Sequence, residues 1–203
     1  MTQPEYIAAL LSIVVGLGLT DLARSLRELV RPRRRVDWHW LPLLWAVTTF
    51  LVSIQLWWNA FSFLKEATSE FFLPFLAAFF FLYLTCAFAL PDPEWQKPQA
   101  TPDASGGPNS SSVPLDLETF YFSDAHRRWY FGMFIAFLVT SQIGGQSVRV
   151  LEKYGANLEE LLINAAFVGL LGTLALTDRW WVHAPISVLC LLGMGWATLT
   201  AIL

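Results

Sequence analysis

The sequence predicts an all-α fold, a polytopic membrane bundle of six transmembrane helices. Hydrophobic residues make up 55% of the 203-residue chain and charged residues only 14%, whereas a soluble domain carries roughly 25% charge. The mean hydropathy is +0.48. A helix needs about 20 mostly apolar residues to cross a bilayer, and the chain contains six such runs. A disordered chain and a disulfide scaffold are therefore excluded.

The first half of the protein, residues 1–91, contains three predicted spans. They cover residues 5–22, with an amphipathic extension to Val30, then residues 38–64 and 71–90. Pro42 and Pro74 each fall in a first helical turn, where the missing N–H costs little.

A Pro/Ser-rich segment, residues 92–114, separates the two halves. It contains five prolines, a Gly106-Gly107 pair and three consecutive serines. Such a stretch cannot bury enough apolar surface to offset the entropy lost on ordering. We expect a flexible loop, followed by a short amphipathic helix at the membrane interface before residue 129.

The second half, residues 115–203, contains the interfacial helix and three further spans, predicted over residues 129–148, 158–177 and 184–202. Three spans, a loop and three more spans form the layout of an inverted 3+3 repeat, as several transporter families have. Six helices without common ancestry between the halves are the alternative, which the sequence leaves open.

The positive charges predict the orientation. Ten of the thirteen Lys and Arg residues follow the first, third and fifth spans. The positive-inside rule places these segments in the cytoplasm, so both termini lie outside and the 92–114 loop lies inside a bacterial inner membrane. The arginine run after the first span is expected to contact anionic lipid headgroups. With a net charge of −3, nucleic acid is not an expected partner. The run comprises Arg31, Arg33, Arg34 and Arg35.

Amide side chains form the most distinctive polar pattern within the spans. Gln55 and Asn59 share one face of the second span, and Gln142 and Gln146 share one face of the fourth. Asn164 lies in the fifth span. Amides in lipid need partners, so this strip predicts either helix-to-helix hydrogen bonds or a path for a small solute or ion.

Charged and histidine side chains cluster near the cytoplasmic ends of the spans. Asp21 and Arg24 are expected to form an interfacial ion pair. Three histidines precede the second, fourth and sixth spans, two of them with an aspartate two residues earlier. Imidazole and carboxylate suit a transition metal, but the spacing is not that of a known metal motif, and an interfacial role is the favoured interpretation. These residues are His39, His126, His183, Asp37 and Asp124.

No catalytic motif is present, and no cofactor is expected. The Gly16–Leu22 segment, the arginine-rich turn, Trp38-His39-Trp40 and the 126–132 segment resemble bacterial multi-pass inner-membrane proteins with no assigned activity. That resemblance implies location and fold only. Two functions follow from the sequence: a non-catalytic helix-bundle subunit or scaffold, which associates with itself or another membrane protein, and a channel or carrier along the amide strip.

Overall fold

The computed structural model describes residues 3–31, 35–66, 72–92, 114–151 and 158–202. Within these ranges the chain forms seven helices, which confirms the predicted all-α class. The helices are α1 (Gln3–Val30), α2 (Trp40–Glu66), α3 (Phe72–Phe88), α4 (Leu117–Phe122), α5 (Asp124–Leu151), α6 (Leu158–Leu176) and α7 (Trp180–Ile202).

The six long helices occupy the six apolar ranges identified in the sequence. The largest difference is at α5, which begins at Asp124 rather than at Trp129. Ser123 has an extended backbone, with φ −64° and ψ 137°, and separates α4 from α5. A carboxylate at the first position of α5 interacts favourably with the helix dipole, which explains the early start.

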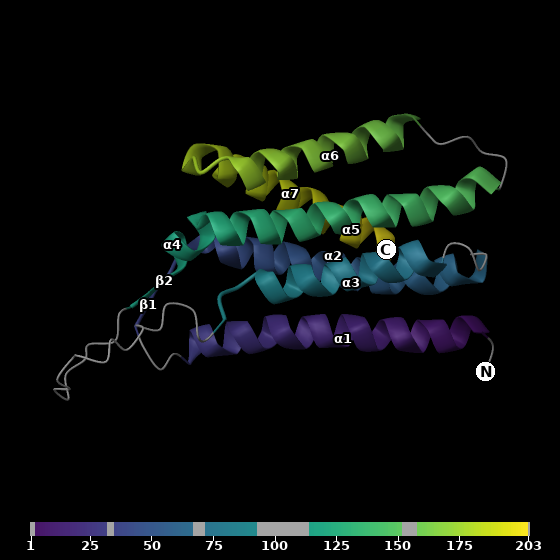
Figure 1. Cartoon of the computed structure of the whole chain (residues 1–203), viewed down its shortest axis with the longest axis horizontal. Helices are drawn as coiled ribbons and strands as arrows, with labels where there is room; N and C mark the ends of the chain where they lie inside the picture. The colour runs from purple at the N-terminus through teal and green to yellow at the C-terminus, as the bar shows by residue number, and fades with distance from the viewer. Residues whose placement is uncertain (1–2, 32–34, 67–71, 93–113, 152–157, 203) are drawn as a thin grey trace.

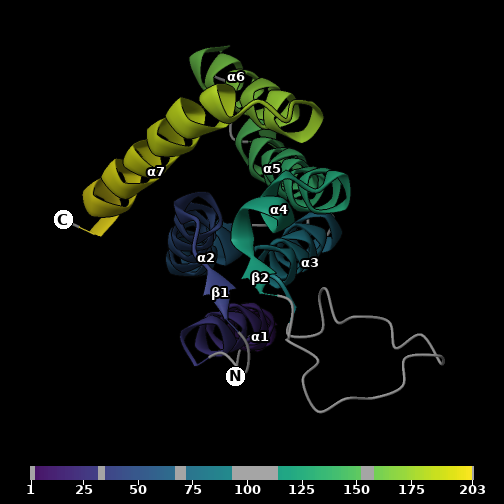
Figure 2. The ribbon, with the colours of Figure 1, turned by 90° about the vertical axis from the view of Figure 1, so that its left-hand side faces the viewer.

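Helices α1, α2, α3, α5 and α6 run roughly along the long axis of the molecule, and α7 crosses them at an angle (Figures 1 and 2). Helix α3 packs between α1 and α5, while α2 packs against α1 and α7. The second half is arranged differently: α1 packs on α3 in the first half, whereas in the described residues the corresponding helices of the second half, α5 and α7, are not in comparable contact. The two halves therefore do not repeat the same packing.

A short parallel strand pair joins the two halves at one end of the bundle. Strand β1 (Val36–Asp37) pairs with β2 (Leu115–Asp116), and Val36 lies opposite Leu115. The Leu115 N–H donates to the Arg35 carbonyl at 2.8 Å. We call this end, which also holds α4 and the α6–α7 connection, the Arg-rich end (Figure 1).

Helix α4 differs from the surface helix expected after the loop, because it is inserted into the bundle end. Leu117 and Tyr121 are fully buried, and Phe120 is nearly so. Leu117 and Tyr121 belong to the main hydrophobic core, together with Trp45 and Phe131. Figure 2 shows α4 above α2 and α3 when the bundle is viewed from this end. The apolar face of α4 contacts protein.

Within the residues that the structure describes, three helical stretches are long and apolar enough to cross a membrane: Glu5–Val30, Trp40–Ala60 and Trp180–Thr200. Two shorter apolar stretches are Leu73–Phe88 and Leu162–Leu176. Length and composition thus support membrane association.

Gly18 marks the closest approach of α1 to α3. A Cβ atom at Gly18 would lie 3.3 Å from Cys86 Sγ and 3.5 Å from the Tyr83 Cα atom, whereas one at Gly16 would meet no atom within 4 Å. We expect Gly18→Val to destabilise the protein by about 1–3 kcal/mol through overpacking. Gly16→Val is the matched control. Equal unfolding midpoints of the two variants in detergent would contradict this packing.

Candidate functional site

The indole of Trp45 connects three elements at the Arg-rich end. Trp45 is 1% exposed, and its Nε1–H faces two acceptors. These are the Tyr121 hydroxyl of α4 at 3.0 Å and the Ser187 hydroxyl of α7 at 2.9 Å. The buried indole N–H of Trp45 on α2 thus holds both α4 and α7 by hydrogen bonds.

The hydrogen bonds continue from Tyr121 to His183. The Tyr121 hydroxyl lies 2.8 Å from His183 Nδ1, and His183 Nε2 lies 2.8 Å from the Thr177 carbonyl oxygen. A carbonyl only accepts, so Nε2 carries the proton and, in the neutral imidazole, Nδ1 accepts from Tyr121. Burial raises the pKa of Tyr121, which keeps this donor protonated. The Trp45 indole N–H, the Tyr121 hydroxyl and both ring nitrogens of His183 therefore all have hydrogen-bond partners.

A second polar contact links α2 to α5. The Tyr130 hydroxyl lies 2.8 Å from Thr49 Oγ1, and Thr49 also donates to the Trp45 carbonyl. Around them the Trp45 ring packs edge-on against Phe131 and Phe134, with centroid distances of 5.1 and 6.0 Å. Such aromatic pairs add stability beyond their buried area.

The three histidines surround α4 and share its rings, because His183 packs against both Tyr121 and Phe122 at 5.3 Å between centroids. His39 packs near Phe122 at 6.4 Å, His126 against Phe120 at 4.2 Å, and His183 against Tyr121 at 5.3 Å between centroids. In the described ranges no three His, Cys, Asp or Glu side chains are placed to hold a metal ion.

The environments of the predicted metal ligands differ from one another. Burial lowers the pKa of His126 to about 3, so its ring is neutral at ordinary pH. Asp37 is exposed, and Asp124 pairs with Arg127. His126 and His183 are buried among aromatic rings, which differs from the interfacial position expected for them.

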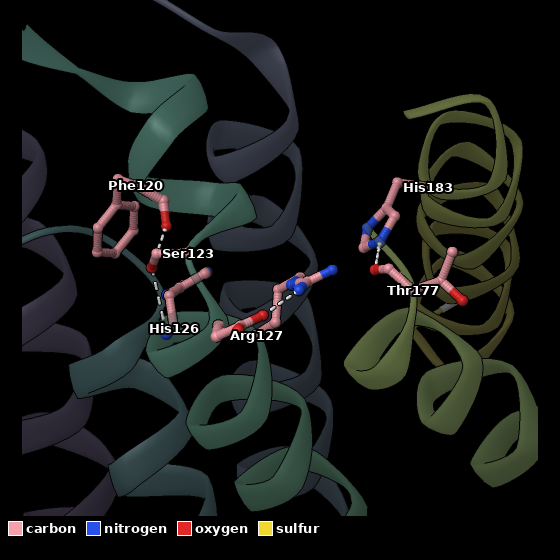
Figure 3. A network of polar contacts seen from close by, with 7 residues as sticks. Phe120, Ser123, His126, Arg127, Thr177 and His183 are labelled. Atoms are coloured by element: carbon pink, nitrogen blue, oxygen red, sulfur yellow. Dashed lines mark hydrogen bonds and ion pairs between the residues drawn. The ribbon is translucent and has the colours of Figure 1, made fainter. Parts of the chain in front are cut away.

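Arg127 is the unusual side chain of this region. It is 6% exposed, and Nη2 contacts Asp124 Oδ1. Its Nε and Nη1 atoms are buried without a hydrogen-bond partner. Figure 3 shows the guanidinium directed from the start of α5 toward the side where Thr177 and His183 lie.

The predicted amide strip does not form a connected network in the described part of the chain. Asn59 is exposed and donates to the Gln55 carbonyl of its own helix at 3.0 Å. Gln142 is half-buried, and no hydrogen bond among the described residues joins it to Gln55 or Asn59. Asn164 is half-buried on α6, and the side chain of Gln146 lies outside the described residues.

The charged residues near the end of α1 also differ from expectation. Asp21 interacts with the hydroxyl of Tyr83 on α3. Among the described residues, the ion pairs include Arg27–Glu28 and Arg127–Asp124, and none joins Asp21 to Arg24. Asp21 therefore acts electrostatically on α3 and is not paired with Arg24. Of the arginine run, Arg31 is exposed, while Arg33 and Arg34 lie outside the described residues.

Asp116 caps the N-terminus of α4. Its carboxylate accepts from the Thr119 hydroxyl and from the Glu118 and Thr119 N–H groups. These bonds, that from the Thr119 hydroxyl above all, hold the pKa of Asp116 below its usual value of 3.8. The capping interaction is thus complete at neutral pH and positions Leu117 and Tyr121 for burial.

Asp116→Ala is expected to lower the free energy of unfolding by about 1 kcal/mol, as the removal of an N-cap side chain does. Because the folded-state pKa is depressed, the contribution of the carboxylate is present above the ordinary pKa of 3.8 and disappears as the pH falls below it. Unfolding titrations at pH 7 and at acidic pH measure this. Glu118→Ala, which removes an exposed carboxylate of the same turn, should cost less. Equal costs for both variants, or a cost for Asp116→Ala that stays constant with pH, would contradict the cap.

Sequence reasoning missed the polar core around Trp45, Tyr121, His183 and Ser187. Its members come from α2, α4 and α7, so no local spacing reveals them. One signal was available: the N–H of a Trp deep in an apolar run needs a buried acceptor.

Comparisons of the chain with protein-family models, with curated proteins and with solved structures each find no match. The function of the protein is therefore inferred from the residues of this site.

Proposed function

We propose that the protein is an integral membrane protein of six spans that acts as a non-catalytic helix-bundle subunit or scaffold. The observation that supports it best is the polar core. In the described residues, the buried side-chain nitrogen and oxygen atoms have partners, with the exception of two atoms of Arg127. Buried polar groups that satisfy one another hold helices together, and they leave no free nucleophile or ligand donor there.

Helix geometry supports six spans in place of three. Helices α3 and α6 contain 17 and 19 residues, which correspond to about 26 and 28 Å. This is close to the roughly 30 Å of the hydrocarbon core, for which 17–25 residues suffice. Helix α3 packs between α1 and α5 along the same axis (Figure 1). Because α3 lies between α1 and α5 and runs along the same axis, it crosses the same part of the bilayer as these neighbours.

The orientation follows from the arginines. The Arg-rich end faces the cytoplasm of a bacterium, with both termini outside, because ten of the thirteen Lys and Arg residues lie on that side. Exposed Trp38, Trp129 and Trp180 are found at this end, as aromatic belts are at membrane interfaces. Anionic headgroups of the cytoplasmic leaflet contact the exposed arginines.

The face of α7 that points away from the bundle is the proposed association surface. Leu189, Leu192 and Trp196 lie on one side of this helix and are each at least 60% exposed. A photoreactive residue at Leu192 should form a discrete protein adduct in native membranes, with a second copy or with another membrane protein. Lipid adducts alone would contradict the scaffold role.

The channel or carrier alternative has a direct test. The purified protein in liposomes should show no proton or potassium flux above that of empty liposomes, because the amide side chains are not joined into a continuous path. A flux that Gln142→Leu abolishes while the folded protein persists would replace the scaffold proposal with the transport one.

A further inference from the structure

The guanidinium of Arg127 is buried by the protein, yet most of its hydrogen-bond donors have no acceptor. Nη2 contacts Asp124, whereas Nε and Nη1 have no partner. Nε carries one N–H and Nη1 carries two, and arginine cannot lose its charge. A buried charge without hydrogen bonds is strongly unfavourable. The Asp124 side chain is 71% exposed. Solvent therefore screens its negative charge, which offsets little of the cost of burying the guanidinium.

The neighbouring polar side chains do not supply the missing acceptor. Arg127 is close enough to Tyr121 and His183 to act on both electrostatically. The Tyr121 hydroxyl already accepts from Trp45 and faces His183, and the second imidazole nitrogen faces Thr177. In Figure 3 the guanidinium is directed toward the side on which Thr177 and His183 lie.

Exposed arginines and carboxylates both lie at this end. Arg128 follows Arg127 on α5, and Arg179 precedes α7. The carboxylates include Asp124, which is paired with Arg127, Asp178, which acts on His183, and Asp116, which caps α4. The planar guanidinium fork matches the oxygens of a phosphate group, to which it donates two parallel hydrogen bonds.

We propose that Arg127 is the anchor of a phosphate-binding site, which binds either the phosphate of an anionic lipid headgroup or free phosphate. In the orientation proposed above, Arg127 lies at the depth of the cytoplasmic headgroups, where both sources are present. The site goes beyond the scaffold role, and its test does not depend on that role.

The test uses the full chain, delipidated in an uncharged detergent, and its thermal unfolding midpoint followed by tryptophan fluorescence. One arm adds inorganic phosphate against chloride at matched ionic strength. The other arm adds phosphatidylglycerol against phosphatidylcholine. A ligand at about 100 times its Kd should raise the midpoint by about 5–10 °C. A rise with phosphate identifies the free ion, and a rise with phosphatidylglycerol alone identifies the headgroup.

Three variants assign the effect to the buried guanidinium. Arg127→Gln should lose the shift, while Arg128→Gln, which removes the adjacent exposed charge, should keep it. Arg127→Lys keeps a charge without the fork and should retain only part of the shift. If Arg127→Gln does not fold, the midpoint shift of Arg127→Lys is compared with that of the wild type instead.

Three results would overturn the proposal. The first is a wild-type protein whose midpoint responds to neither phosphate nor phosphatidylglycerol. The second is a full shift that persists in Arg127→Gln or Arg127→Lys. The third is an equal loss in Arg128→Gln, which would indicate general attraction of anions to a basic surface.

Discussion

Tyr121→Ala is expected to lower the free energy of unfolding by about 3–5 kcal/mol, the range for removal of a large buried aromatic side chain. The Tyr121 side chain is fully buried in the core. Its loss leaves a cavity and also removes an acceptor from Trp45 and the partner of His183 Nδ1. Unfolding in mixed micelles, followed by tryptophan fluorescence, measures the change.

Two companion variants separate packing from hydrogen bonding. Tyr121→Phe keeps the ring and should cost about 1–3 kcal/mol, because it leaves buried partners unsatisfied. Tyr6→Ala removes a tyrosine that is 63% exposed and should cost little. If Tyr121→Ala is no more destabilising than Tyr6→Ala, then α4 is not part of the core.

Leu117→Asp is expected to cause the other large loss, of several kcal/mol or complete failure to fold, because it buries a carboxylate without a partner. Leu117 is fully buried where α4 enters the bundle end. The control is Ala125→Asp, which places the same charge at an exposed position in the first turn of α5, where a carboxylate is favourable. The yield of monodisperse protein and its unfolding midpoint give the comparison.

A tolerated Leu117→Asp would contradict the inserted position of α4. It would indicate instead that this helix lies on the membrane surface, as its sequence alone suggests.

The helices could be predicted because long apolar runs determine them locally. The position of α4 could not, since Leu117, Phe120 and Tyr121 have the spacing of any amphipathic helix, whether its apolar face meets lipid or protein. The pairing of Val36 with Leu115 joins residues far apart in the chain through two-residue strands. Such short strands leave no periodic pattern to recognise.

The site was predicted only in part. The three histidines were expected at one end of the bundle, and they do lie around α4 there. The sequence could not predict which rings they contact, because that depends on how α4 inserts against α2 and α5. Arg127 looked like one more positive charge for orientation, and only its burial distinguishes it from Arg128.

The most direct test of the six-span account is the side of the membrane on which the central loop and the C-terminus lie. A reporter that is active only in the cytoplasm is placed within residues 92–114 in one fusion and after Leu203 in another. Six spans with a cytoplasmic Arg-rich end predict activity in the loop and none at the C-terminus. If only the stretches Glu5–Val30, Trp40–Ala60 and Trp180–Thr200 crossed the membrane, with α1 in the same orientation, the loop would lie outside and the C-terminus inside. Activity at the C-terminus without activity in the loop would therefore contradict the account.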